Sequence, residues 1–283
     1  MRDVRTDLSK WLLLLALLLT SGCGGAAYLS KGQFDQAISE YISKGQFDQA
    51  ISEYNKALEI NPRYALAYSN RGTMYRMKRQ YDQAISDFTK ALEINPRDAV
   101  SYSNRGAVYQ LKGQYDQAIS DYSKALEIEP RDLLAYSGRG NAYEKKGQYD
   151  QAIADYSKAL EIEPRSAGAY KSRGLAYERK GQYDQAIVDY SKSLEVTRDN
   201  LAYFDRDRRL ANESKGQYDQ RVSASTKLWE KNRGELYNYR ARAYYYLKDY
   251  DKAWDDVHKA QELGAKIDDG FLKDLREASG REK

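Results

Sequence analysis

The sequence predicts an all-α solenoid of stacked helix pairs, and two observations carry this prediction. One phrase, written in full at residues 112–128, recurs along the chain, so that its glutamine stands every 34 residues at Gln46, Gln80, Gln114, Gln148 and Gln182. A fixed period of this length is typical of one supersecondary unit repeated in tandem. Within the copy at 99–132, apolar and small residues recur three, four and seven positions apart, which places them on one face of a helix.

Each copy is expected to hold two antiparallel helices. Lys112-Gly113 separates the two apolar groups, because glycine takes the left-handed conformation that ends a helix. Asp116 follows in the first turn of the second helix, where a carboxylate favours the positive end of the helix dipole. Pro130 then interrupts the chain, and Asp132 can cap the next helix. Helices of roughly 12 to 14 residues are marginal in water, so each pair must complete its core against its neighbours.

These residues resemble the motif of the tetratricopeptide repeat (TPR) family, a helix–turn–helix with aromatic, small and proline positions at fixed offsets. The copy at 99–132 carries that motif at Tyr102, Gly106, Tyr109, Ala118, Tyr122, Ala125 and Pro130. The copies with Tyr68 and Tyr136 match equally, whereas the copy with Tyr170 has Ser193 for alanine and Arg198 for proline. The resemblance implies a right-handed superhelical solenoid, in which glycine and alanine stand where two helices cross and tyrosine rings fill the space between helices.

Composition agrees with a thin array and gives no sign of nucleic-acid binding. The 283 residues carry 46 basic and 42 acidic side chains, a net charge of +4, and the mean hydropathy is −0.86. No long basic run marks a nucleic-acid groove. The 27 tyrosines recur with the repeat, so we interpret them as packing between helices and not as a platform for stacked bases.

The N-terminal residues predict export. Residues 1–22 join a charged start to the short apolar stretch 11–19, which is too short for a comfortable membrane span and is typical of a signal peptide. Leu19-Thr20-Ser21-Gly22-Cys23 resembles the lipobox of bacterial lipoproteins, although Thr20 stands where that family usually has leucine. This resemblance implies lipid attachment at Cys23, a short linker at 23–27 and, because Gly24 follows, the periplasmic face of the outer membrane. Cleavage near 25–27, giving a secreted protein, and an uncleaved anchor at 11–19 remain as alternatives.

Five further segments follow from how closely each copy keeps the pattern. We predict a TPR array over 28–265, with an irregular first repeat at 28–64, regular repeats at 65–200, a degenerate repeat at 201–233 and a last repeat at 234–265. In the degenerate repeat Arg208 or Arg209 takes the glycine position and Arg221 the alanine position, which indicates either drift or a basic hinge or docking patch. Residues 266–283 predict an amphipathic helix and tail that cap the array or bind a partner, with Phe271, Leu272 and Leu275 on its apolar face.

The residue types needed for catalysis do not gather at any one place. His258 is the only histidine, and neither Cys23 nor a second histidine stands near it, which argues against a metal site. The carboxylates recur with the repeat, as at Asp121, and we assign them to a solvated face and to helix dipoles. No phosphate-binding loop or nucleophile elbow is present. We therefore expect no enzyme, cofactor, metal or small-molecule substrate; an enzyme acting on the cell wall is the alternative of another class.

By resemblance to the TPR family, the first helices line a concave groove that holds a partner peptide or helix. The candidate groove residues are Ser69, Asn70, Thr73, Arg76, Ser103, Asn104, Ala107, Gln110, Asn141, Glu144, Lys171, Leu175 and Glu178. Asparagine can grip an extended backbone because its amide offers both a donor and an acceptor. The lysine–asparagine clamp of chaperone-binding relatives is absent, since Lys171 is followed by Leu175. The sequence thus predicts a protein-interaction scaffold at the bacterial cell envelope, with a secreted or inner-membrane-anchored scaffold as the alternative.

Overall fold

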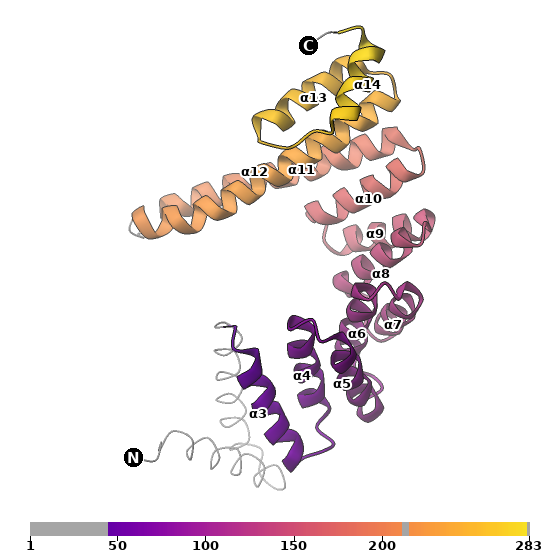
Figure 1. The fold of residues 1–283 in the computed structure, drawn as a ribbon, viewed down its shortest axis with the longest axis vertical. Coiled ribbons are helices and arrows are strands. Elements are labelled where there is room, and N and C mark those ends of the chain that lie inside the picture. Colours follow the sequence, from indigo (N-terminus) through magenta and orange to yellow (C-terminus); the bar gives the residue numbers. More distant parts are fainter. Residues whose placement is uncertain (1–44, 211–214, 282–283) are drawn as a thin grey trace. The chain divides into compact units, whose positions relative to one another are not determined.

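The computed structural model describes residues 45–210 and 215–281, and for 200–226 it describes the backbone alone. Every regular element in this described part of the chain is a helix, and consecutive helices form antiparallel pairs (Figure 1). The prediction of an all-α fold built from such pairs is confirmed. The chain divides into two compact units, residues 1–130 and 131–283, which are taken in turn below.

The first unit contains two complete pairs preceded by one second helix. In each pair a first helix of 13 residues is followed by a second helix of 14 residues. The helices are α3 (Phe47–Ile60), α4 (Ala65–Met77), α5 (Tyr81–Ile94), α6 (Ala99–Leu111) and α7 (Tyr115–Ile128). The two first helices, α4 and α6, also contact each other, so their outward faces adjoin. Most of the irregular first repeat, 28–44, and all of 1–27 lie outside the described residues.

The second unit begins with the same pairs and then departs from them. Its helices are α8 (Leu133–Lys145), α9 (Tyr149–Ile162), α10 (Ala167–Arg179), α11 (Tyr183–Leu210), α12 (Lys215–Tyr246), α13 (Tyr250–Glu262) and α14 (Asp269–Ser279). Here α11 and α12 are 28 and 32 residues long, about twice the usual length. The first helices of this unit are α8, α10 and the 234–246 part of α12, and α10 contacts both of the others.

The helix ends follow the turn residues expected from the sequence. Gly113 has φ 73°, the left-handed conformation that ends a helix, and Arg79 takes it with φ 59°. A non-glycine residue in this region costs about 1 kcal/mol. Asp132 caps α8, because its carboxylate accepts hydrogen bonds from the backbone amides of Leu134 and Ala135 at 2.8 and 3.1 Å.

The small residues stand where the two helices of a pair cross. A Cβ added to Gly174 would lie 2.8 Å from the ring of Tyr190, closer than real side chains approach. The corresponding alanines of the second helices, such as Ala118 and Ala125, are fully buried. The prediction that glycine and alanine permit this close crossing is confirmed.

The predicted degenerate repeat at 201–233 takes the form of a helical arm. Thr197 and Arg198 stand where the preceding repeat has Glu163 and Pro164, so nothing stops α11 and it continues to Leu210. The first 19 residues of α12, 215–233, return beside it (Figure 1). We call the pair of extensions, 197–210 and 215–233, the arm. At 1.5 Å per residue, the α11 extension is about 21 Å long. The side chains of Arg208, Arg209 and Arg221 lie outside the described part.

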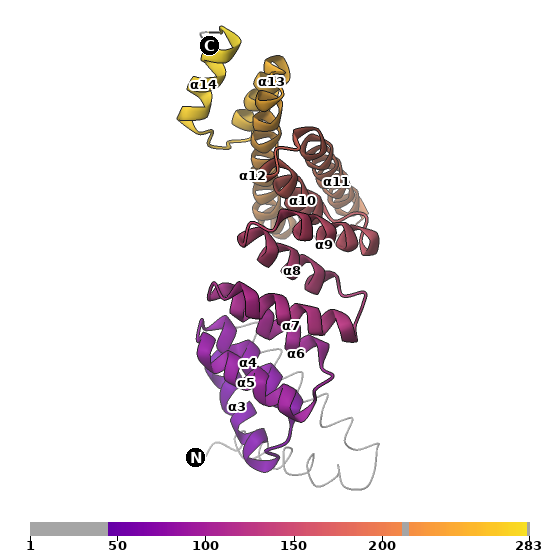
Figure 2. The ribbon, with the colours of Figure 1, turned by 90° about the vertical axis from the view of Figure 1, so that its right-hand side faces the viewer.

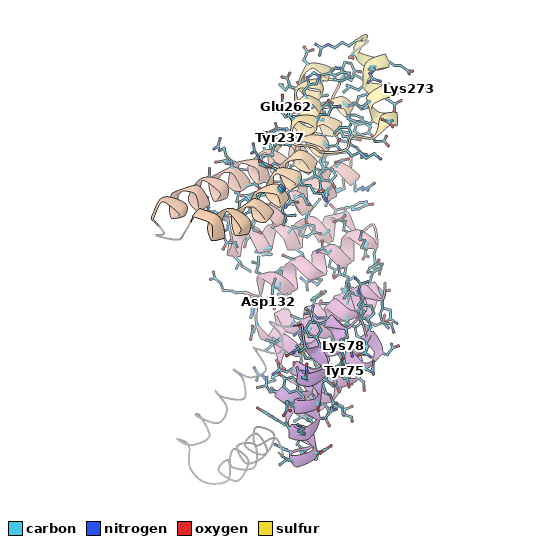
Figure 3. The ribbon with its side chains drawn as sticks, turned by 60° about the vertical axis from the view of Figure 1, so that its left-hand side comes forward. Tyr75, Lys78, Asp132, Tyr237, Glu262 and Lys273 are labelled. Atoms are coloured by element: carbon cyan, nitrogen blue, oxygen red, sulfur yellow. The ribbon has the colours of Figure 1, made fainter. Side chains whose placement is uncertain are left out.

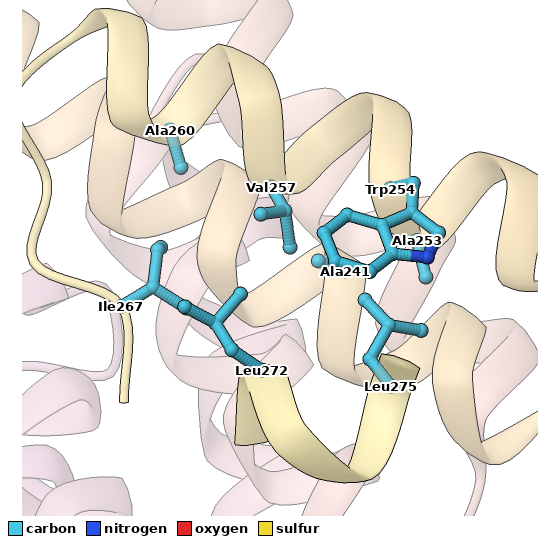
Figure 4. Close-up of a cluster of buried hydrophobic side chains, with 8 residues drawn as sticks. All are labelled: Ala241, Ala253, Trp254, Val257, Ala260, Ile267, Leu272 and Leu275. Atoms are coloured by element: carbon cyan, nitrogen blue, oxygen red, sulfur yellow. The ribbon is translucent and has the colours of Figure 1, made fainter. Parts of the chain in front are cut away.

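The last repeat packs directly on the fifth, past the arm. Leu236 and Ala243 of α12 join a buried cluster with Ala186, Tyr190 and Leu194 of α11. Beyond this repeat, α14 lies against α13 (Figure 2). Its apolar face closes a second cluster, shown in Figure 4, which consists of Ala241, Ala253, Trp254, Val257, Ala260, Ile267, Leu272 and Leu275. The predicted capping helix is therefore present.

Candidate functional site

The repeated carboxylates on the second helices are buried, which corrects their assignment to a solvated face. Asp121 is only 5% exposed, because it receives two hydrogen bonds of 2.7 and 2.8 Å from the guanidinium of Arg105. The same two-point pair, with distances of 2.7 to 2.9 Å, occurs in every complete repeat that the structure describes: Arg71–Asp87, Arg105–Asp121, Arg139–Asp155, Arg173–Asp189 and Arg240–Asp256. Each pair joins the first helix of a repeat to its second helix.

Each of these guanidinium groups also fixes its repeat to a neighbouring helix. The third nitrogen of Arg173 donates to Ser157 of the preceding second helix at 3.0 Å, and Arg105 donates likewise to Thr89 at 2.9 Å. The hydrogen bond to its aspartate raises the pKa of Arg173 above its ordinary value. Because all the donors are used within the array, this recurring charge cluster is structural and offers no reactive group. Its signal in the sequence was an arginine 16 positions before each aspartate.

In the first unit, the candidate residues lie on α4 and α6 with different degrees of access. Ser69 is 4% exposed, and its hydroxyl lies 2.8 Å from that of Ser101, which removes it from any accessible surface. Thr73 uses its hydroxyl to donate to the carbonyl of Ser69 at 3.1 Å. The half-buried candidates of this unit are Asn70, Thr73, Arg76, Ser103, Asn104, Ala107 and Gln110.

In the second unit, several candidates are held by internal bonds. The hydroxyl of Tyr156 points to Asn141 at 2.6 Å and to Glu144 at 3.1 Å, and that of Tyr190 donates to Glu178 at 2.7 Å. Burial, followed by the charge of the neighbouring glutamate, raises the pKa of both tyrosines, so their hydroxyls remain donors.

Two ion pairs connect neighbouring first helices in this unit. Glu178 lies 3.8 Å from Arg242, and Lys171 lies 4.0 Å from Glu235. Leu175 packs against the cluster between α11 and α12. The candidate side chains of α10 are therefore tied to one another and to α12.

Family models of the tetratricopeptide repeat match residues 65–98, 99–132, 134–166 and 167–200, and a further TPR model matches residues 39–78. The chain belongs to the tetratricopeptide repeat family. Among curated protein sequences, none matches it.

Solved structures of other TPR proteins have a similar fold. The chain is similar to a crystal structure of MamA, with 30% identity, a TM-score of 0.56, and 59% of this chain and 97% of that chain covered. It is also similar to YrrB, described as a TPR protein with an unusual peptide-binding site, with 20% identity, a TM-score of 0.56, and 74% and 91% covered. A MamA from Desulfovibrio magneticus RS-1 has 21% identity, a TM-score of 0.56, and 63% and 98% covered. The last two likenesses concern the fold alone.

One TPR repeat departs from the others on its first-helix face. In the repeats at 99–132, 133–166 and 167–200 the twelfth position is Gln110, Glu144 or Glu178, and each accepts a hydrogen bond from a tyrosine of the following second helix, at 3.2, 3.1 and 2.7 Å. In the repeat at 65–98 the twelfth residue is Arg76, and Phe88 stands in place of the tyrosine. Phenylalanine has no hydroxyl, and arginine accepts no hydrogen bond, so this internal bond is lost.

Neither a metal site nor a membrane-spanning helix is found where the TPR structure is described. No group of three or more histidine, cysteine, aspartate or glutamate side chains could hold a metal ion in that part. None of the helices at 45–210 and 215–281 is long and apolar enough to cross a membrane. Cys23, the predicted lipid-attachment residue, and the apolar stretch 11–19 lie outside these residues.

Proposed function

We propose that this TPR protein is a non-enzymatic scaffold that holds a partner peptide or helix against its first helices. The family, whose repeats serve protein interaction, supports this proposal. The observation that carries it is the state of the asparagines on the first helices of unit one. Asn70 and Asn104 are half-buried, and neither amide has a hydrogen bond in the part of the chain that the structure describes. Each amide can donate to and accept from a partner backbone.

The distribution of apolar side chains supports the same face. Second helices direct their apolar residues into the core, where Phe88 and Ala91 are fully buried. The first helices keep Leu66 and Val100 at 42% and 58% exposure, although both side chains are large and apolar. Exposed apolar side chains next to free amides fit a surface that another protein covers.

Site-specific photocrosslinking in cells tests this proposal. A photoreactive residue at Asn104 should crosslink to a partner protein, whereas the same residue at Lys124, an exposed position on the second helix α7 with 53% side-chain exposure, should not. Equal crosslinking from both positions, or none from Asn104, would contradict binding by the first helices. Turnover of a cell-wall substrate by the purified chain would favour the alternative of an enzyme.

We further propose that the scaffold is tethered to the cell envelope by lipid at Cys23, on the periplasmic face of the outer membrane. The charged start, the short apolar stretch at 11–19 and the lipobox-like residues before Cys23 support this location. A multiply acylated cysteine would provide stable attachment. Cys23→Ala should abolish labelling with palmitate and release the protein from the membrane fraction. Unchanged membrane retention without labelling would favour an uncleaved anchor, and secretion of the unaltered protein would favour an ordinary signal peptide.

A further inference from the structure

The coupled exception at Arg76 and Phe88 leaves a positive charge without an internal partner. Arg76 has neither a hydrogen bond nor an ion pair in the described part of the chain, and its Nε atom is buried without an acceptor. A buried donor without an acceptor is rare and calls for a partner that the isolated chain does not supply. Its neighbours Tyr75 and Lys78 are marked on α4 in Figure 3.

The other cations of α4 and α6 show that Arg76 is unusual. Arg71 and Arg105 hold buried aspartates, while Lys78 bonds to Asp48. Lys112, which follows α6, bonds to Asp82. Arg76 alone among these cations has nothing to neutralise it, although it lies on a helix that already contributes candidate contact residues.

Large apolar side chains lie at both ends of the same two helices. Leu66 and Val100, near the start of α4 and α6, are 42% and 58% exposed, and Met77 and Leu111, at their ends, are 51% and 58% exposed. Met77 directly follows Arg76 in sequence. A partner segment that covers both apolar ends therefore passes Arg76 and continues beyond it.

We propose that α4 and α6 bind a partner segment in which an acidic side chain lies between apolar residues, with Arg76 pairing the acid. This inference rests on the proposed scaffold function and names the chemistry of its partner. The planar guanidinium of arginine suits a carboxylate because it can donate two parallel hydrogen bonds. The apolar residues of the segment cover Leu66, Val100, Met77 and Leu111, and the free amides of Asn70 and Asn104 are available to its backbone.

Selection from a defined peptide library tests the proposal with the purified full-length chain. The probe is a randomised library of 12-residue peptides with acetylated and amidated ends, so that every carboxylate in it is a side chain. We expect enrichment of peptides with one aspartate or glutamate flanked by leucine, isoleucine, methionine or phenylalanine. Replacing one selected acid by its amide should weaken binding at least tenfold. A second library with free C-terminal carboxylates would show whether a chain end binds as well as a side chain.

Two variants link this result to Arg76. The double variant Arg76→Gln with Phe88→Tyr recreates the Gln110–Tyr122 pair of the next repeat, so it should fold, as circular dichroism can verify, and lose the preference for acids. Arg76→Glu should shift enrichment from acidic to basic side chains. Arg97→Gln, in the exposed loop after α5, is the matched control and should leave the selection unchanged.

Each remaining result contradicts the proposal in a distinct way. Acid-containing peptides that bind both the unaltered chain and the double variant equally would overturn the role of Arg76 and leave the scaffold function intact. Enrichment only through free C-terminal carboxylates would overturn the choice of an acidic side chain. A complete lack of peptide binding would overturn this inference, and only when joined by a lack of crosslinking at Asn104 would it also overturn the proposed function.

Discussion

Two junctions between consecutive repeats in the second unit have the same contacts but very different connections. At the first, α10 follows α9 through a short loop, and Arg173 donates to Ser157 at 3.0 Å. At the second, the arm separates α11 from the last repeat, and Arg240 donates to Ser191 at 2.9 Å. The separation in sequence of donor and acceptor rises from 16 to 49 residues, a difference of 33.

The comparison teaches that the stacking of these repeats depends on their side chains and not on the chain that joins them. The difference of 33 residues equals the length of segment 201–233, so the last repeat occupies the place that would follow the fifth directly. Repeat proteins gain stability from interfaces between neighbours, and this interface has been kept while a repeat-length segment was displaced from the stack.

The largest expected effect comes from removing the arginine at each junction. Arg173→Ala and Arg240→Ala leave the buried carboxylates of Asp189 and Asp256 without a partner, so each should lower the free energy of unfolding by about 3–5 kcal/mol in urea titrations. Arg165→Ala removes an ion pair to Asp199 whose arginine side chain is 62% exposed, and should cost less than about 1 kcal/mol. A much smaller loss for Arg240→Ala than for Arg173→Ala would break the equivalence of the two junctions.

Gly234 tests the point where the arm meets the last repeat. A Cβ added there would lie 2.8 Å from the Cβ of Ala265, so Gly234→Ala should destabilise the protein by about 1–3 kcal/mol in spite of the better helix propensity of alanine. Gly168→Ala, on α10, is the control, because nothing lies within 4 Å of its added Cβ. Thermal unfolding should show a lower midpoint for the first variant only; a shared response would mean that packing at Gly234 is loose.

A smaller and equal effect is expected from the serines that accept the arginine hydrogen bonds. Ser157→Ala and Ser191→Ala should each cost about 1 kcal/mol, because each removes one hydrogen bond to a charged donor. The exposed Ser120→Ala provides the baseline for the substitution itself. Unequal losses, measured by urea titration, would sharpen the comparison by showing which junction is the tighter one.

Deleting the arm should have the smallest effect on the stack. Removal of 201–233 joins Asn200 to Gly234 and restores the 34-residue period, so the unfolding midpoint of the shortened chain should stay close to that of the full chain. Removal of 215–232 alone is the contrasting case. The four residues at 211–214 span at most about 14 Å, less than the extension of α11 that they would have to retrace, so this variant should lose helix by circular dichroism. Unfolding of the last repeat in the first variant would show that the arm supports it.

The helix pairs, their turns and the capping helix could be predicted because each depends on local spacing. Gly113, Pro130 and Asp132 mark helix boundaries by their own backbone chemistry. The burial of Asp121 could not be read in this way, since an aspartate on a second helix is exposed or buried according to whether an arginine reaches it from another helix. The absence of Pro at Arg198 was visible, but that the helix would continue into an arm depends on the packing of α12 beside it.

The candidate surface was predicted less completely than the fold. The family pattern indicates which positions lie on the first helices, and the candidates do lie there. It does not indicate which side chains are already occupied: Ser69 lies against Ser101, and Glu178 against Tyr190, through contacts specific to this chain. Arg76 stands out only when Phe88 is considered with it.

The final helix makes the stack finite in one direction. Leu275 occupies the position at which the complete repeats carry Gly72, Gly106, Gly140 and Gly174, and it is fully buried against Trp254 and its neighbours. Arg281 bonds to Asp251 across 30 positions, as Lys180 does to Asp150, so α14 stands where a further first helix would be. A leucine at the crossing point leaves no room for a second helix behind it. Gene duplication can therefore lengthen this protein upstream of Leu275, whereas copies appended after the C-terminus would find no complementary surface on which to dock.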